Sequence, residues 1–225
     1  MVRENFIIAI DGFSSCGKST VAKALAKTLN FVFVDSGAMY RAVTLYFLRN
    51  AINCSDTAAV QEALNNIHID FIPNTEKTQI LLNGEDVSDE IRQMEVSEMV
   101  SEVSAIKEVR RAMVSQQQQL GARRNIVMDG RDIGTTVFPD ADLKIFMTAD
   151  PLIRANRRLA ELLAKGETVT LEEVIENLAH RDHIDSTREE SPLRQASDAI
   201  VLDNSYMTQE EQLDLVLNEY QSRLK

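Results

Sequence analysis

The chain has 225 residues, of which 44% are hydrophobic and 26% charged, so it has room for one globular α/β domain with an insertion but not for two enzymes. Its net charge of −11 argues against nucleic acid as a partner, because nucleic-acid binding depends on basic surface that faces phosphate. No stretch reaches the ~18 apolar residues of a membrane span or resembles a signal peptide, and Cys16 and Cys54 have neither disulfide-framework nor zinc-site spacing, so we expect a cytoplasmic protein with no membrane partner.

The first predicted element is a buried parallel strand at Phe6–Ile10, which Asp11 and Gly12 interrupt. Gly12–Thr20 then fits the phosphate-binding loop pattern G-x-x-x-x-G-K-[ST] at every fixed position, and apolar residues at helical spacing follow it. The backbone N–H groups of such a loop and the positive end of the helix point at one place, which favours phosphate.

Each polar residue of the loop has an expected role in this phosphate site. Lys18 can reach the outer phosphates as a point charge, and the hydroxyl of Ser19 or Thr20 can ligate Mg²⁺. We assign the metal to Ser19 and regard Cys16 as a residue that only fills the loop. We expect the nucleotide to contact the whole loop, which consists of Gly12, Phe13, Ser14, Ser15, Cys16, Gly17, Lys18, Ser19 and Thr20.

A second strand is predicted at Phe31–Val34, and a helix at 38–48 that Ser36 is placed to cap. Tyr40 and Arg41 lie near the start of this helix. Doubly wound sheets place ligands just past the carboxyl ends of their strands. This position favours substrate-binding roles, although core packing would also explain Tyr40 and a solvated surface charge would explain Arg41.

Segment 59–106 has a different pattern, which we interpret as a small antiparallel insertion. Strands are predicted at Ile67–Phe71 and Thr78–Leu82, and Asn83-Gly84 is a strong hairpin signal. A helical stripe then runs over Glu95–Gln119. Ser101 and Arg110 fall on opposite sides of one straight helix, because nine residues at ~100° each separate them. A shared ligand therefore requires a break around 105–107.

The next apolar strand, Asn125–Asp129, ends in an acid, an arrangement that resembles the Walker B carboxylate that assists Mg²⁺. Arg131 and Asp132 follow at once. They place a guanidinium and another acid beside the phosphate loop, which a purely structural turn does not need. We therefore count both among the candidate site residues.

Another strand is predicted at Leu143–Met147, followed by a helix that Asp150-Pro151 opens. Its arginines can form a lid over a triphosphate, or only surface salt bridges; they are Arg154, Arg157 and Arg158. Thr170 and Glu173 form a capping box for the next helix.

That second helix carries Arg181, Asp185 and Arg188 on one face if it extends that far. The three side chains fit either an exposed ion-pair ladder or a polar wall of the cleft. A last strand is predicted at Ala199–Asp203, and Thr208 with Glu211 caps a C-terminal helix.

Taken together, these motifs resemble the bacterial cytidylate kinases, nucleoside monophosphate kinases of the P-loop superfamily, over nearly the whole chain. The resemblance is carried by the phosphate loop and by five further stretches: 35–41, 84–92, Asp129–Thr135, Val137–Ala141, and Arg181-Asp182 with Asp185 and Arg188. It differs at 13–16, where relatives commonly have Pro and small residues.

The resemblance implies transfer of the ATP γ-phosphoryl group to CMP or dCMP with Mg²⁺. By analogy, Arg41, Arg131 and Arg188 hold the acceptor phosphate, while Arg181 and Asp185 reach the ribose. Ser101, Arg110 and Asp132 read cytosine in the same analogy, and Arg157 belongs to the ATP site. The implied catalytic residues are Lys18, Arg131, Asp132 and Arg188, and the acceptor site also takes Ser36 and Tyr40.

The implied fold is a P-loop doubly wound parallel sheet with a monophosphate-binding insertion at 59–106 and a lid with its following helix at 154–189. The core then comprises 1–58, 107–153 and 190–225, and we expect a monomer. Two alternatives stay open at this point. One is a P-loop kinase for another small acceptor, such as UMP, AMP or shikimate, and the other is a nucleotide-switch module, against which the chain lacks a guanine-reading Asn-Lys-x-Asp motif.

Overall fold

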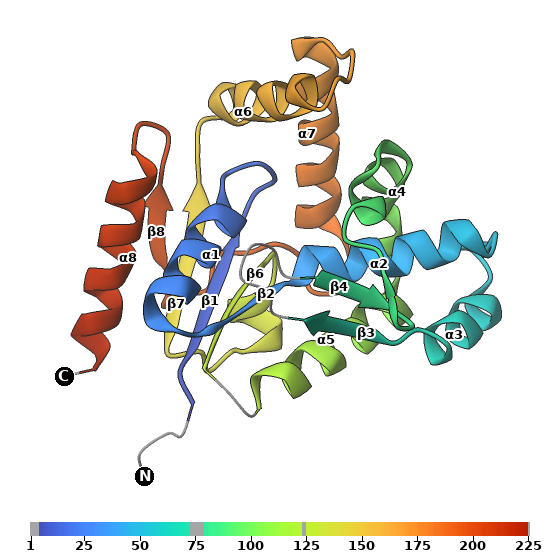
Figure 1. Cartoon of the computed structure of the whole chain (residues 1–225), viewed down its shortest axis with the longest axis horizontal. Helices are drawn as coiled ribbons and strands as arrows, with labels where there is room; N and C mark the ends of the chain where they lie inside the picture. The colour runs from blue at the N-terminus through green and yellow to red at the C-terminus, as the bar shows by residue number, and fades with distance from the viewer. Residues whose placement is uncertain (1–4, 73–78, 123–124, 225) are drawn as a thin grey trace.

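The computed structural model describes residues 5–72, 79–122 and 125–224. Its centre is a parallel sheet of five strands in the order β2-β6-β1-β7-β8 (Figure 1). The strands are β1 (Ile7–Gly12), β2 (Val32–Asp35), β6 (Ile126–Gly130), β7 (Leu143–Thr148) and β8 (Ile200–Asp203). The predicted α/β fold with a parallel sheet is confirmed.

Both faces of this sheet are covered, which is why its strands are continuously apolar. Ile8 and Ile10 of β1 pack with α1 (Lys18–Leu29) and α8 (Gln209–Arg223). Ala9 points to the opposite face, where it packs with residues of the π-helical turn η2 (Ile133–Val137). Because successive side chains of a strand point to opposite faces, the apolar residues of β1 contribute to two separate hydrophobic cores.

The strand β1 runs through Asp11 and Gly12, two residues farther than predicted. Asp11 is tolerated because its carboxylate accepts hydrogen bonds from the N–H groups of Ile133 and Gly134, at 2.8 and 2.7 Å. Gly12 has a φ of +149° and pairs closely with β7, where a Cβ would lie 2.0 Å from the Met147 carbonyl oxygen. These contacts hold the strand straight up to the phosphate loop.

The helix α2 (Ser36–Arg49) begins earlier than predicted, and its N-cap is Asp35 rather than Ser36. Asp35 accepts a hydrogen bond from the Ala38 N–H, while the Ser36 hydroxyl donates to the Asp129 carbonyl oxygen at 2.6 Å. The prediction that Ser36 caps the helix was therefore wrong. Asp35, at the end of β2, is the N-cap of α2, and Ser36 connects α2 to β6 instead.

The insertion consists of a helix, a three-stranded antiparallel sheet and a short 3-10 turn. The hairpin prediction is confirmed, because Asn83 and Gly84 have φ values of +52° and +86° and join the last two strands. The first strand starts at Ile69 rather than Ile67, and Thr78 of the second predicted strand lies outside the described residues. These elements are α3 (Thr57–Asn65), β3 (Ile69–Ile72), β4 (Gln79–Leu82), β5 (Glu85–Asp86) and η1 (Glu90–Arg92).

The long helical stretch is broken as predicted, into α4 (Met94–Ala105) and α5 (Lys107–Gly121). Ile106 between them has extended backbone angles, with φ of −66° and ψ of 125°. The break turns the chain so that Ser101 and Arg110 line the same cleft. Packing of both helices against α2 fixes the turn.

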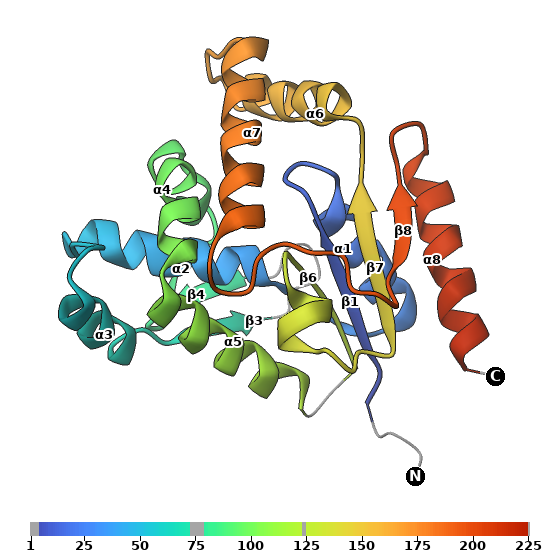
Figure 2. The same cartoon turned by 180° about the vertical axis from the view of Figure 1, so that it is seen from behind.

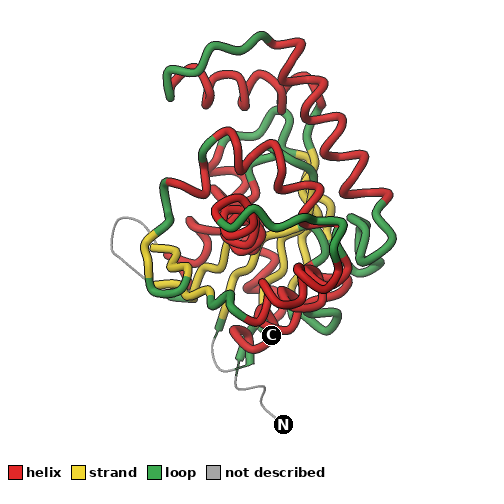
Figure 3. Tube along the Cα trace, turned by 90° about the vertical axis from the view of Figure 1, so that its right-hand side faces the viewer, coloured by secondary structure: helices red, strands yellow, loops and turns green. Residues whose placement is uncertain are grey.

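Two further helices lie above the carboxyl ends of the strands (Figures 1 and 2). They are α6 (Pro151–Ala164) and α7 (Leu171–Thr187), and they overhang the rest of the chain in the side view (Figure 3). The Thr170–Glu173 capping box is confirmed. Arg188, however, lies one residue beyond α7, so the prediction of three charged residues on one helix face holds for Arg181 and Asp185 only. Among the described residues, no helix is long and apolar enough to cross a membrane.

Candidate active site

A cleft of about 660 Å³ lies at the carboxyl ends of β1, β2 and β6, between the phosphate loop, the insertion and the overhanging helices. It brings together most of the residues that the sequence predicted for the site, from segments far apart in the chain. The predicted residues that line it are Ser14, Ser15, Gly17, Lys18, Ser19, Thr20, Ser36, Tyr40, Arg41, Ser101, Arg110, Arg131, Asp132, Arg181, Asp185 and Arg188.

Four predicted residues do not line this cleft. Gly12 lies in β1, Phe13 packs edge-on against the Phe146 ring at 5.9 Å between centroids, and the Cys16 thiol is buried beneath the loop. Arg157 donates to the side-chain and main-chain oxygens of Asn204, at 3.0 and 2.9 Å. The unusual aromatic residue of the loop therefore points away from the cleft.

One end of the cleft is formed by the phosphate loop. Gly17 has a φ of +87°, which a side chain would strain, and it precedes the first turn of α1. The Lys18 ammonium donates to the carbonyl oxygens of Gly12 and Phe13, at 2.9 and 2.7 Å. Burial lowers the pKa of Lys18, and the nearby Arg131 lowers it further. An anion bound between these groups would relieve both effects.

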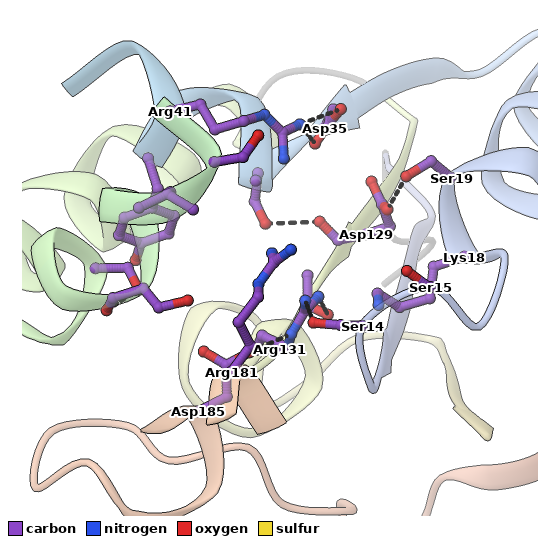
Figure 4. Close-up of a pocket in the computed structure, with 18 of the residues that line it drawn as sticks. Ser14, Ser15, Lys18, Ser19, Asp35, Arg41, Asp129, Arg131, Arg181 and Asp185 are labelled. Atoms are coloured by element: carbon purple, nitrogen blue, oxygen red, sulfur yellow. Dashed lines mark hydrogen bonds and ion pairs between the residues drawn. The ribbon is translucent and has the colours of Figure 1, made fainter. Parts of the chain in front are cut away.

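Ser19 and Asp129 form a hydrogen-bonded pair between the loop and the end of β6 (Figure 4). The Ser19 hydroxyl donates to Asp129 Oδ2 at 2.6 Å, while the buried Oδ1 has no hydrogen-bond partner in the described part of the chain. Burial and the neighbouring Asp35 raise the pKa of Asp129 to about 7. These hydroxyl and carboxylate oxygens fit the ligand preferences of Mg²⁺, which commonly binds one or two carboxylates together with substrate phosphates.

The opposite side of the cleft is lined by arginines from three segments of the chain. Arg131 donates through Nε to Asp185 at 2.7 Å and through NH2 to the Ser14 hydroxyl at 2.8 Å, whereas Arg41 pairs with Asp35 at 3.3 Å. Arg181 extends from α7 into the space between these groups (Figure 4). Burial, followed by repulsion from Arg131, lowers the pKa of Arg181 to about 10.

A second group of charges lies deeper, beside α4 and α5. Arg110 is 1% exposed and pairs with Asp132 at 2.5 Å, and its guanidinium lies 5.2 Å from the centre of the Tyr40 ring. Arg188 pairs with Asp185 at 3.2 Å and with Asp132 at 3.6 Å. Burial alone would lower the pKa of Arg110, but Tyr40 and Asp132 outweigh it and raise the value. This end is therefore a neutralised, hydrogen-bonding wall rather than an open cationic one.

The cations of the cleft and its deeper Arg110–Asp132 pair suit different kinds of ligand group. Lys18, Arg41 and Arg181 are cations whose pKa values are lowered by burial, and Arg41 Nε and Arg181 Nε are buried without hydrogen-bond partners among the described residues. Such groups are stabilised by phosphate, which offers negative charge and several acceptor oxygens. The Arg110–Asp132 wall can instead form directional hydrogen bonds with a neutral polar ring.

Comparison with known proteins agrees with this geometry. Residues 8–222 match the family model described as cytidylate kinase. The chain belongs to the cytidylate kinase family. A cytidylate kinase of Cytophaga hutchinsonii is 56% identical over 96% of this chain and 93% of its own length, and one of Bacteroides fragilis is 56% identical over 97% of both chains.

Two solved structures share the fold of this chain. An uncharacterized protein from Eubacterium ventriosum has a TM-score of 0.55 at 13% identity, covering 97% of this chain and 99% of that one. TT1252 from Thermus thermophilus has a TM-score of 0.50 at 20% identity, covering 99% and 100%. At these identities the likeness concerns the fold alone.

Several residues around the cleft of this cytidylate kinase family member were not predicted from sequence. Asp35 both caps α2 and pairs with Arg41, and an acid directly after a predicted strand was the available signal for it. Asp182 contacts the Ser14 N–H from α7, and the Asn204 amide donates to the Cys16 carbonyl oxygen at 2.7 Å. These two contacts join segments more than 160 residues apart, so no local pattern could reveal them.

Proposed function

We propose that this chain transfers the γ-phosphoryl group of ATP to CMP and dCMP, giving ADP with CDP or dCDP. The observation that carries the proposal is the single cleft, in which a phosphate loop at one end faces convergent arginines and a buried Arg110–Asp132 pair at the other. The 56% identity to cytidylate kinases over nearly the whole chain supports it.

The reaction needs positioning and charge stabilisation rather than a catalytic base. The second pKa of a phosphate monoester is ~6, so the acceptor phosphate is already ionised near neutral pH. Its oxygen forms a bond to the γ-phosphorus in line with the bond to the β–γ bridging oxygen, which breaks as ADP leaves. Lys18 and Arg131 lie where they would stabilise charge on the transferred group. Arg41 and Arg188 would hold the acceptor phosphate beside them.

Mg²⁺ belongs to this proposal as a partner of the bound ATP. Ser19 and Asp129 would hold it, because their oxygens converge and Asp129 Oδ1 has no other partner among the described residues. When bound, the ion supplies charge neutralisation to the β- and γ-phosphates. Asp35 is paired with Asp129 in the sheet register and adds negative charge to the same place.

The base and sugar of the acceptor would be recognised at the deep end of the cleft. Ser101, Arg110 and Asp132 would read cytosine, since Asp132 offers acceptor oxygens for an exocyclic amino group and Arg110 offers donors. Arg181 and Asp185 would reach the ribose from α7. Ser36 and Tyr40 would complete the wall, and Arg157 would contact ATP only after leaving Asn204. The division into core, insertion (59–106) and lid (154–189) belongs to the same proposal.

The proposed setting is a cytoplasmic monomer that acts on small molecules only. The net charge of −11 supports the expectation that nucleic acid is not a partner. A single chain already contributes both ends of the cleft, so no second copy is needed to complete it. Sedimentation of the purified protein would check the oligomeric state directly.

An acceptor panel in a coupled ADP-release assay tests the function. ATP is supplied with CMP, dCMP, UMP, AMP or shikimate, and kcat/KM is measured for each. We expect CMP and dCMP to exceed AMP and shikimate by roughly 10²-fold or more, because a site built to hydrogen-bond one ring leaves its groups unpaired with another. Equal rates for all acceptors would contradict the assignment, and binding of ATP without turnover of any acceptor would favour a nucleotide switch.

A further inference from the structure

Ser14, near the tip of the phosphate loop, is held by three different residues through three of its polar groups. Its N–H donates to Asp182 Oδ1 at 3.2 Å, and its carbonyl oxygen accepts from Arg154 NH1 at 3.1 Å. Its hydroxyl accepts from Arg131 NH2 at 2.8 Å. Both polar groups of the Ser14 backbone are thus hydrogen-bonded, while its hydroxyl contacts Arg131 (Figure 4).

The two residues that grip the backbone form an ion pair with each other. Arg154 NH1 lies 2.6 Å from Asp182 Oδ2, and the side chains are only 9% and 14% exposed. Arg154 belongs to α6 and Asp182 to α7, the two helices that overhang the cleft (Figure 1). The pair therefore connects both helices to the loop at one point.

Arg154 is itself fixed by further contacts, so it cannot move without disturbing the loop. Its Nε donates to the Ala149 carbonyl oxygen at 3.2 Å, just before α6 begins. Its guanidinium lies 5.3 Å from the centre of the Phe13 ring, a distance that fits a cation–π contact. Phe13 in turn packs on Phe146 of β7. The aromatic residue at position 13 thus supports the arginine rather than the nucleotide.

We propose that Arg154 and Asp182 are a positioning pair, which sets the geometry of the donor loop through the backbone of Ser14. This inference rests on the proposed phosphoryl transfer. Neither residue lines the cleft, so neither is a catalytic residue. Their effect on the reaction passes through Ser14, whose backbone N–H and carbonyl oxygen they hold.

The pair should affect the donor side of the reaction and leave acceptor affinity nearly unchanged. The loop N–H groups and Lys18 contact ATP, and their positions depend on the tip of the loop. The Arg110–Asp132 wall is formed by α5 and the turn after β6, and it has no hydrogen bond to Arg154 or Asp182 in the described part of the chain. If the ion pair were purely structural, its removal would lower thermal stability without weakening ATP binding more than CMP binding.

The test compares Asp182→Asn with Glu176→Gln, the same chemical change at an exposed position of α7. ADP affinity is measured by calorimetry, and KM for ATP, KM for CMP and kcat by the coupled assay. For Asp182→Asn we expect ADP affinity and kcat/KM for ATP to fall roughly tenfold, because the amide has no charge and only one acceptor oxygen, and so cannot hold both the Ser14 N–H and Arg154 as the carboxylate does. We expect KM for CMP to stay within about twofold, as should every constant of the control.

An unchanged ADP affinity and kcat in folded Asp182→Asn would overturn the proposal, as would an equal loss on the CMP side. ADP binding needs no acceptor, so this arm remains informative even if the acceptor were not CMP. If Asp182→Asn fails to fold, Arg154→Lys replaces it. That variant keeps the charge but cannot hold Ser14, Asp182 and Ala149 together, and it should show the same donor-side loss.

A double-mutant cycle tests whether Arg154 and Asp182 act through the same residue, Ser14. If Arg154 and Asp182 act together through Ser14, Arg154→Gln with Asp182→Asn should weaken ADP binding no more than about twofold beyond the stronger single variant. Fully additive losses would show two independent roles and would contradict the pair.

Discussion

In the proposed reaction, the donor loop and the acceptor wall would bind phosphate by different means. The donor loop, Gly12–Thr20, is one continuous segment with a single lysine, and six of its residues line the cleft. The acceptor wall, which we define as Arg41, Arg110, Arg131, Asp132, Arg181, Asp185 and Arg188, comes from four separate segments. Its arginines are mostly paired with carboxylates, whereas the Lys18 ammonium rests on carbonyl oxygens.

This difference indicates how each side gains specificity. A loop of backbone N–H groups binds any phosphate chain, because it offers charge and donors without reading the rest of the molecule. Paired charges are held in fixed directions and are costly to leave unmatched, so they distinguish one ligand from another. In the proposed reaction, the donor side would therefore supply rate, and the acceptor wall would supply selectivity.

The largest expected effect is on the donor side, in Lys18→Met. Removing the one lysine of the loop should lower kcat by roughly 10³-fold, because charge on the transferred group loses its nearest stabilising cation. The coupled ADP-release assay with CMP measures the change. Lys27→Met, at an exposed position of the same helix, is the matched control. A loss below about tenfold would mean that the acceptor arginines carry the rate as well.

The acceptor wall is tested by Asp132→Asn. We expect kcat/KM for CMP to fall roughly 10²-fold while KM for ATP stays within about twofold, since the side-chain partners of Asp132 lie on the acceptor wall and not in the phosphate loop. Leaving Arg110 without its partner should also destabilise the fold by about 3–5 kcal/mol, so urea unfolding accompanies the kinetics. Asp214→Asn on the exposed side of α8 is the control. Unchanged kcat/KM for CMP would remove Asp132 from the site.

Asp11 joins the two regions, because its carboxylate at the end of β1 holds the turn that follows Asp132. Burial raises the pKa of Asp11 to about 6, although the hydrogen bonds from Gly134 and Ile133 oppose the rise. The folded state therefore keeps this proton to higher pH than the unfolded state does. The stability that it contributes is present below about pH 4 and is lost as pH rises through about 6.

The measurement is the urea unfolding free energy of the wild type and Asp11→Asn between pH 4 and pH 8. Relative to the variant, the wild type should lose up to ~3 kcal/mol over this range, with most of the loss below about pH 6.5. Parallel curves for the two proteins would show that Asp11 has an ordinary pKa.

The smallest expected effect concerns the overhanging helices. Thr170→Ala removes the N-cap of α7, which should destabilise the protein by ~1 kcal/mol in thermal unfolding. We expect kcat and both KM values to stay within about twofold, because the cap lies at the far end of the helix from Asp185. A large kinetic effect would show that α7 must be fully ordered for catalysis.

Most of the parallel sheet and several turns could be predicted from local patterns. The Asn83-Gly84 hairpin, the break at Ile106 and the Thr170 capping box each depend on a few neighbouring residues. The cap of α2 could not be predicted correctly, because Asp35 and Ser36 are both good N-caps. The choice was made by Asp129 on another strand, whose carbonyl oxygen accepts the Ser36 hydroxyl.

The sequence by itself determined the phosphate loop, the kinds of side chain at the site and, through its motifs, the family. These features are fixed by residue type and by spacing within short segments. Only the tertiary structure decided which carboxylate pairs with which arginine, that Phe13 supports Arg154 instead of lining the cleft, and that Asp182 reaches Ser14. Such contacts join distant segments, and their geometry follows from packing of whole helices against the sheet.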